Sequence, residues 1–204
     1  VFESFTELSK DTEAMLSDFA ADLGRPLDQV NEEHDGRWEA LRDIVVSPKE
    51  KAVVDARMTE HDNEDMQILL NLFVFLAKER GKKIDLSCVD YLIVRLDLPS
   101  IDAAIDHLQN LRRSHKSYPQ LFTLGPDHST IYLYTVERAI PVVGGIRRAI
   151  LSLVAFTKLC DAEITNVKAA TDVVKFFYCG TGLPLNKPKY VKNALKIFRS
   201  SNSD

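Results

Sequence analysis

Four consecutive stretches decide the expected fold: MQILLNLFVFLAKERG (66–81), LSCVDYLIVRLDL (86–98), PSIDAAIDHLQNLRRSH (99–115) and QLFTLGPDHSTIYLYT (120–135). In the first three, apolar residues recur mainly at three- and four-residue steps, which is typical of helices. In the fourth, two apolar runs flank a turn rich in glycine, proline and aspartate, which favours a β-hairpin. The sequence therefore predicts three helices followed by a hairpin.

The order of these elements over residues 65–136 resembles that of winged-helix domains, a group of helix-turn-helix proteins. The resemblance spans about 70 of the 204 residues and rests on element order and apolar spacing. It implies a three-helix scaffold with a β-hairpin wing at the centre of the chain. It implies no particular function, because one scaffold serves many functions.

Helical patterns flank this centre on both sides. On the N-terminal side, Ser47, Pro48 and Glu50 mark a helix start, because serine and glutamate can cap free amides reciprocally and proline needs no partner at the first helical position. Further runs with helical spacing follow the hairpin, the last of them after Asn186. We therefore expect a mainly α-helical protein.

Three regions are predicted. They are an acidic N-terminal helical region over residues 1–60, a winged-helix-like domain over 63–137, and a helical region with a basic last helix over 138–204. The polar stretch TEHDNED (59–65) lies between the first two regions and is the predicted hinge.

Charge is distributed unevenly along the chain. Residues 1–60 carry 15 acidic and 7 basic side chains, a net charge of −8, whereas residues 166–204 carry 2 and 7, a net charge of +5. This polarity favours either a head-to-tail contact between copies or an acidic partner at the C-terminal end. Two solvated ends of a single fold would give the same pattern.

The cysteine pattern and the hydropathy indicate an intracellular protein, cytoplasmic or nuclear. Cys88, Cys160 and Cys179 are odd in number and widely spaced, whereas a disulfide framework or a zinc site needs close pairs. They are interpreted as reduced thiols in the core. No apolar run approaches the roughly 18 residues that span a bilayer, so no transmembrane segment is expected.

The predicted third helix is acidic at its start, which disfavours DNA reading. In a DNA-binding winged helix, the N-terminal part of this helix leads into the major groove. Here it carries Asp102 and Asp106, which phosphates repel, and the hairpin tip has no lysine or arginine. Asp102 and Asp106 are therefore the candidate protein interface.

Two basic groups are the candidate binding sites for nucleic acid or another acidic partner. One follows the third helix, and the other lies on the predicted last helix, where its positive side chains could contact phosphates without reading bases. A solvated amphipathic helix is the alternative interpretation of the second group. The candidate residues are Arg112, Arg113, Lys116, Lys187, Lys189, Lys192, Lys196 and Arg199.

No catalytic or cofactor motif stands out. Gly180, Thr181 and Gly182 precede Lys187, but a phosphate-binding loop needs its glycines after a strand and its lysine at a helix start. No serine lies in a nucleophile elbow, and the carboxylates fall on predicted solvated faces. We expect no catalytic residue, no cofactor and no metal.

The sequence thus predicts a non-enzymatic protein-interaction and self-association module on a winged-helix scaffold, with a protein partner or a second copy. The first alternative is a nucleic-acid-binding structural or regulatory protein, viral or chromosomal, that uses the basic last helix. The second is an enzyme whose site is assembled from residues far apart in the sequence.

Overall fold

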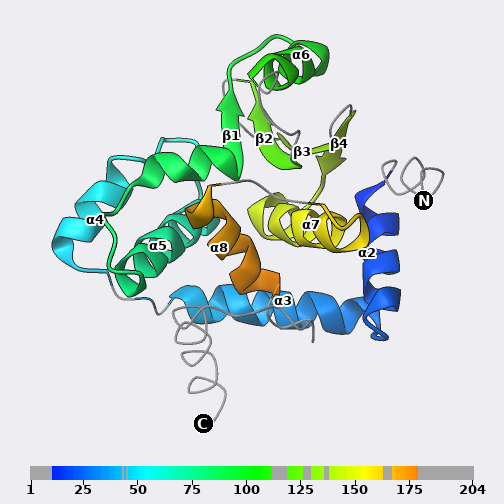
Figure 1. The fold of residues 1–204 in the computed structure, drawn as a ribbon, viewed down its shortest axis with the longest axis horizontal. Helices are drawn as coiled ribbons and strands as arrows, with labels where there is room; N and C mark the ends of the chain where they lie inside the picture. The colour runs from blue at the N-terminus through cyan, green and yellow to red at the C-terminus, as the bar shows by residue number, and fades with distance from the viewer. Residues whose placement is uncertain are drawn as a thin grey trace.

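The computed structural model describes residues 11–42, 44, 46–111, 119–125, 130–135, 138–162 and 167–178. Seven α-helices and one short 3-10 helix surround a small four-stranded sheet in this part of the chain (Figure 1). The helices are α2 (Thr12–Asp22), α3 (Leu27–Arg42), α4 (Pro48–Asp55), α5 (Glu64–Glu79), η1 (Leu86–Tyr91), α6 (Ile101–Leu111), α7 (Gly145–Leu159) and α8 (Lys168–Tyr178). The strands are β1 (Ile93–Leu96), β2 (Gln120–Leu124), β3 (Thr130–Thr135) and β4 (Arg138–Val142).

The predicted helix boundaries are explained by local capping. At the start of α4, the backbone amide of Ser47 donates to the Glu50 carboxylate at 2.6 Å, and the Glu50 amide donates to the Ser47 hydroxyl at 3.4 Å. This reciprocal cap confirms the predicted start. Helix α5 ends just before Gly81, whose φ of +62° lies in the left-handed region that favours glycine.

The sheet has the order β1-β2-β3-β4. Strand β1 pairs in parallel with β2, with Ile93 opposite Leu121, and α6 forms the connection between them. The predicted hairpin is confirmed, because β2 and β3 pair antiparallel with Leu121 opposite Leu133. Strand β4 extends this antiparallel arrangement, with Leu133 opposite Ile140.

The predicted second helix of the central unit was wrong. Leu86–Tyr91 forms a 3-10 helix, and Ile93–Leu96 forms strand β1. The side chains of Ile93 and Leu96 are buried on opposite faces of the sheet, in two different apolar clusters. A strand covered on both faces is mostly apolar, as β1 is apart from Arg95, and a short apolar run of this kind does not distinguish a strand from a helix.

Strand β4 was also not predicted, and it contains Pro141. Proline has no N–H to donate, so it is tolerated only where that position faces away from the neighbouring strand. Strand β4 lies at the edge of the sheet, with Pro141 opposite Tyr132, which is where a strand can accept a proline. With β1 and β4 added, the fold is mainly helical with a four-stranded sheet, and a winged-helix arrangement is not confirmed.

Apolar side chains gather on both faces of the sheet. The main core includes residues from α2, α3, α5, α7 and α8, together with one face of the sheet. On the opposite face lies a smaller group that we call the cap cluster. Among the described residues, its buried members are Leu96, Ala104, Leu108, Phe122 and Tyr134.

The main core draws residues from all three predicted regions, for example Trp38, Leu69 and Phe177. The predicted boundaries between the three regions, at residues 60–63 and 137–138, stay predictions. Among the residues that the structure describes, no helix is long and apolar enough to cross a membrane.

Candidate functional site

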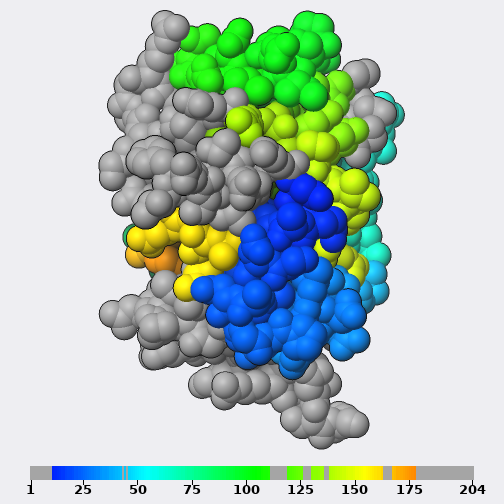
Figure 2. Space-filling model, turned by 90° about the vertical axis from the view of Figure 1, so that its right-hand side faces the viewer, coloured from blue at the N-terminus to red at the C-terminus, as the bar shows by residue number. Residues whose placement is uncertain are grey.

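Helix α6 lies at one end of the molecule (Figure 1). Its inner face is fixed by Ala104 and Leu108, which pack on Phe122 and Tyr134 of the sheet. The four-residue spacing of the two inner residues places them on one side of the helix. The opposite side is therefore left facing outward, and Figure 2 shows α6 as part of the outer surface, in green, away from the blue N-terminal helices.

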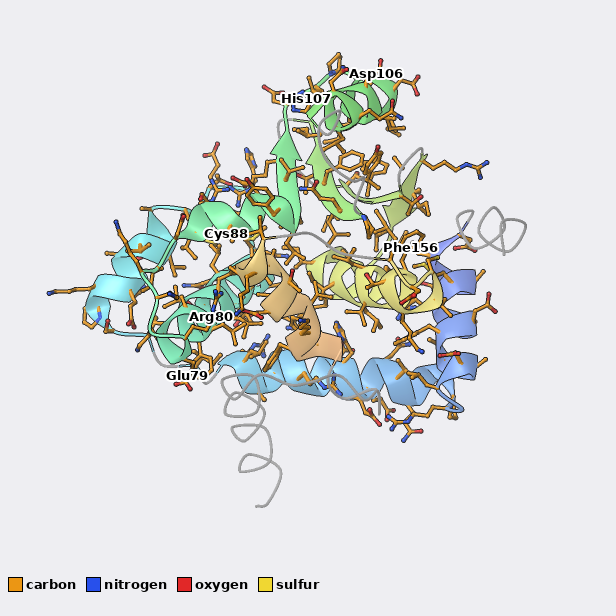
Figure 3. All side chains as sticks on the ribbon, viewed as in Figure 1. Glu79, Arg80, Cys88, Asp106, His107 and Phe156 are labelled. Carbon is orange, nitrogen blue, oxygen red and sulfur yellow. The ribbon has the colours of Figure 1, made fainter. Side chains whose placement is uncertain are left out.

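The outer face of α6 carries the predicted interface residues. Asp102 and Asp106 are exposed, and Figure 3 shows Asp106 beside His107 on the outward side of the helix. Neither carboxylate forms an ion pair with any residue of the described ranges. No segment of that part of the chain buries this face. Its role as an interface stays a prediction.

Two exposed residues near the start of α6 were not singled out from the sequence. Asp97, in the connection from β1, is exposed, and Ile101, the first residue of α6, leaves 37% of its surface accessible. Ile101 lies three and four residues before Ala104 and Ile105, so it continues the apolar side of α6 and exposes the end of that side at the start of the helix. The signal that could have identified them is their position: both lie within five residues of Asp102 on the approach to the helix. We call Asp97, Ile101, Asp102 and Asp106 the α6 surface.

The predicted basic sites lie outside the described residues. This applies to the group after α6 and to the group on the predicted last helix, namely Arg112, Arg113, Lys116, Lys187, Lys189, Lys192, Lys196 and Arg199. Their roles in binding nucleic acid or another acidic partner stay predictions.

A second candidate is a small hollow between α2, α3, α7 and α8. It encloses about 300 Å³, including space open to solvent, and its polar lining comes from Arg25, Glu33, His34 and Arg37. Arg25 is committed to Glu33 through bonds of 2.8 and 3.0 Å, and Arg37 donates to the backbone oxygen of Phe177 at 2.5 Å. These groups hold helices together, so the hollow is the weaker candidate.

His34 is the buried group of this hollow. Its Nε2 atom lies 2.8 Å from the backbone oxygen of Arg147 and 2.9 Å from Nε1 of Trp38. The tryptophan N–H can only donate and the carbonyl can only accept. A protonated Nε2 serves the carbonyl, and an unprotonated Nε2 serves the tryptophan, so each neutral tautomer satisfies one of the two groups.

The pKa of His34 is lowered from 6.5 to about 3, chiefly by burial and to a smaller extent by the cationic Arg37, Arg148 and Arg147, against the opposing effect of its hydrogen bond to the Arg147 carbonyl. The ring is therefore neutral in the folded protein near pH 7. As the pH falls below 6.5, the unfolded chain takes up this proton first, so the free energy of unfolding decreases between pH 6.5 and 3.

We expect His34 to make the fold acid-sensitive. From these two pKa values, its contribution lowers the free energy of unfolding by about 2 kcal/mol between pH 7 and pH 5. Urea unfolding at the two pH values measures this difference. In His34→Gln the difference should shrink, whereas the control His61→Gln, which changes a more exposed histidine, should retain it. An unchanged pH slope in His34→Gln would contradict the assignment.

The described residues offer little for metal or thiol chemistry. Within the described ranges, no three His, Cys, Asp or Glu side chains gather as they would around a metal ion. Cys88 and Cys160 are free, half-buried thiols, and burial raises the pKa of Cys160 to about 11. A thiol with so high a pKa is a poor nucleophile at pH 7.

The predicted hinge is held by ion pairs to other elements. Asp62 binds Arg95 of β1 through both carboxylate oxygens, at 2.6 and 2.7 Å. Asp65 binds Arg147 of α7 at 2.8 Å. These carboxylates link the stretch 59–65 to the sheet and to α7.

Comparison of the chain with models of protein families, with curated proteins and with solved structures found no match.

Proposed function

We propose that the protein is a non-enzymatic interaction module that self-associates through the α6 surface. The observation that carries this proposal is an amphipathic helix whose inner face is packed on the sheet while its outer carboxylates have no partner in the described part of the chain. Beyond the favourable effect of Asp102 on the α6 dipole, these carboxylates have no opposite charge beside them in the described fold, so they gain from contact with a basic surface.

The chain itself supplies a basic segment. Between residues 187 and 199 the sequence has five basic and no acidic side chains. Contact between this segment of one copy and the α6 surface of another would bring basic side chains beside carboxylates. It would thereby reduce the repulsion within each group of like charges. Such a contact is head-to-tail, so it can close into a ring or extend into a filament, depending on the rotation between copies.

A double charge reversal on the α6 surface tests this proposal. We expect the wild-type protein to increase in mass with concentration in sedimentation equilibrium, more at low salt than at high salt, because exposed charges are screened. In the variant Asp102→Lys with Asp106→Lys, we expect the dissociation constant to rise at least tenfold, which corresponds to about 1.4 kcal/mol.

The matched control is Asp28→Lys with Glu32→Lys on α3. Both pairs are exposed, start at the second residue of a helix and have the same four-residue spacing. The two variants thus share the charge change and the effect on the helix dipole. Equal weakening in both variants would contradict the α6 surface, and a monomeric wild type at every concentration would contradict self-association.

A further inference from the structure

The attachment of α6 differs from that of the other helix on the sheet. Helix α7, on the opposite face, is fixed by ion pairs as well as by packing: Arg147 binds Asp65 at 2.8 Å, and Arg148 binds Glu13 at 2.7 Å. From residue 101 to residue 110 of α6, by contrast, no side chain forms an ion pair or hydrogen bond that the structure describes. The only described polar cap is the Ser100 hydroxyl, which accepts from the Ala103 amide at 3.1 Å.

Packing therefore holds α6, and that packing is limited in extent. The cap cluster is separated from the main core by the sheet, and Ala104 and Leu108 are the fully buried residues among the described side chains of α6. Ile105 adds a half-buried contact. The free energy that opposes opening of a segment rises with its buried apolar contacts and protected hydrogen bonds, so a helix with so few of them opens at lower cost than the core.

We infer that α6 opens as a separate unit while the sheet and the main core stay folded. The strands do not depend on α6 for their own hydrogen bonds, since β1 pairs directly with β2 and the remaining pairs are antiparallel. Their other face stays covered by α7 through Leu121 and Leu133, which belong to the main core. The helix is thus a releasable lid on a sheet that is held from the other side.

Opening would uncover an aromatic surface. Phe122 and Tyr132 stack with ring centroids 5.1 Å apart and planes 16° apart, and Tyr134 is fully buried beside them in the cap cluster. Three aromatic side chains on neighbouring strands form a continuous apolar face when α6 is absent. The lid would therefore control access to this face, whether or not the α6 surface binds a second copy.

Native-state hydrogen exchange of the full chain tests the lid directly. We expect the amides of α6 to exchange through a smaller opening than those of α5 and α7. Leu108→Ala removes most of the lid's fully buried side chain, so α6 exchange should accelerate at least about thirtyfold, and α5 and α7, which exchange through global unfolding, should keep their larger opening free energy relative to α6. Nitration of Tyr134 should accelerate together with α6 exchange, because the same opening exposes both.

Two further variants keep the test decisive. Gln109→Gly changes an exposed residue of α6 and should accelerate α6 exchange about threefold through helix propensity alone. Leu151→Ala in α7 opens the main core and should accelerate exchange in α5 and α7. Because the core stays folded when the lid opens, Leu151→Ala should leave α6 exchange unchanged; if it accelerates α6 as much as α5 and α7, the lid opens only with the whole protein and the inference is overturned.

Discussion

Replacing Trp38 with alanine is expected to lower the free energy of unfolding by about 3–5 kcal/mol, the range for removing a large buried aromatic side chain. Trp38 is fully buried and stacks on Phe177 of α8, with centroids 5.2 Å apart. The guanidinium carbon of Arg147 lies 5.8 Å from the centre of its ring. The residue thus joins α3, α7 and α8, and its removal leaves a cavity where the three helices meet.

Circular dichroism during urea unfolding is the suitable measurement, because Trp38 is the sole tryptophan of the chain and fluorescence is lost with it. The control Trp38→Phe keeps an aromatic ring and removes the N–H. It also frees Nε2 of His34 to donate to the Arg147 carbonyl without competition, so we expect a loss of about 2 kcal/mol or less. A cost below 1 kcal/mol for Trp38→Ala would contradict the role of Trp38 in this helix junction.

Replacing Asp62 with alanine is expected to cost about 3 kcal/mol, because removal of one partner leaves a poorly solvated charge on the other. The side chains of Asp62 and Arg95 are 7% and 17% exposed, and the carboxylate also accepts from the Thr59 amide at 2.7 Å. The substitution therefore releases Arg95 and loosens the turn before α5.

An exposed ion pair provides the comparison. Lys51 and Asp55 of α4 are 3.6 Å apart, and both side chains are more than half exposed. Such pairs contribute less than about 1 kcal/mol, so Asp55→Ala should have little effect on thermal or urea unfolding. Equal losses in Asp62→Ala and Asp55→Ala would show that the buried pair has no special contribution.

The sequence predicted those elements that a single periodicity identifies. Helices α5 and α7 have apolar spacing over four turns, and the capped start at Ser47 is a local signal. The prediction for β1 was wrong because this strand is buried on both faces. Its burial depends on α6 and α7, and a short window of sequence around β1 does not show that these helices pack against it. Strand β4 was missed for a similar reason. Proline is tolerated in an edge strand, and whether a strand lies at the edge cannot be recognised before the sheet is known.

The candidate site was predictable in part. Exposure of Asp102 and Asp106 followed from the apolar positions of α6, because the inner face fixes the outer one. The cluster of His34, Trp38 and Phe177 did not follow, since Phe177 lies 140 residues from its neighbour Arg37 and only the tertiary fold brings α8 onto α3. The pairing of Asp62 with Arg95 likewise joins residues 33 positions apart.

The central claim is that copies of the protein meet through the α6 surface. A dilution series of isotope-labelled protein, followed by the backbone amide resonances in NMR, tests it most directly. We predict concentration-dependent shifts at Asp97, Ile101, Asp102 and Asp106, and none at Asp28 or Glu32 of α3. Resonances that do not move with concentration, or shifts confined to other surfaces, would contradict the claim.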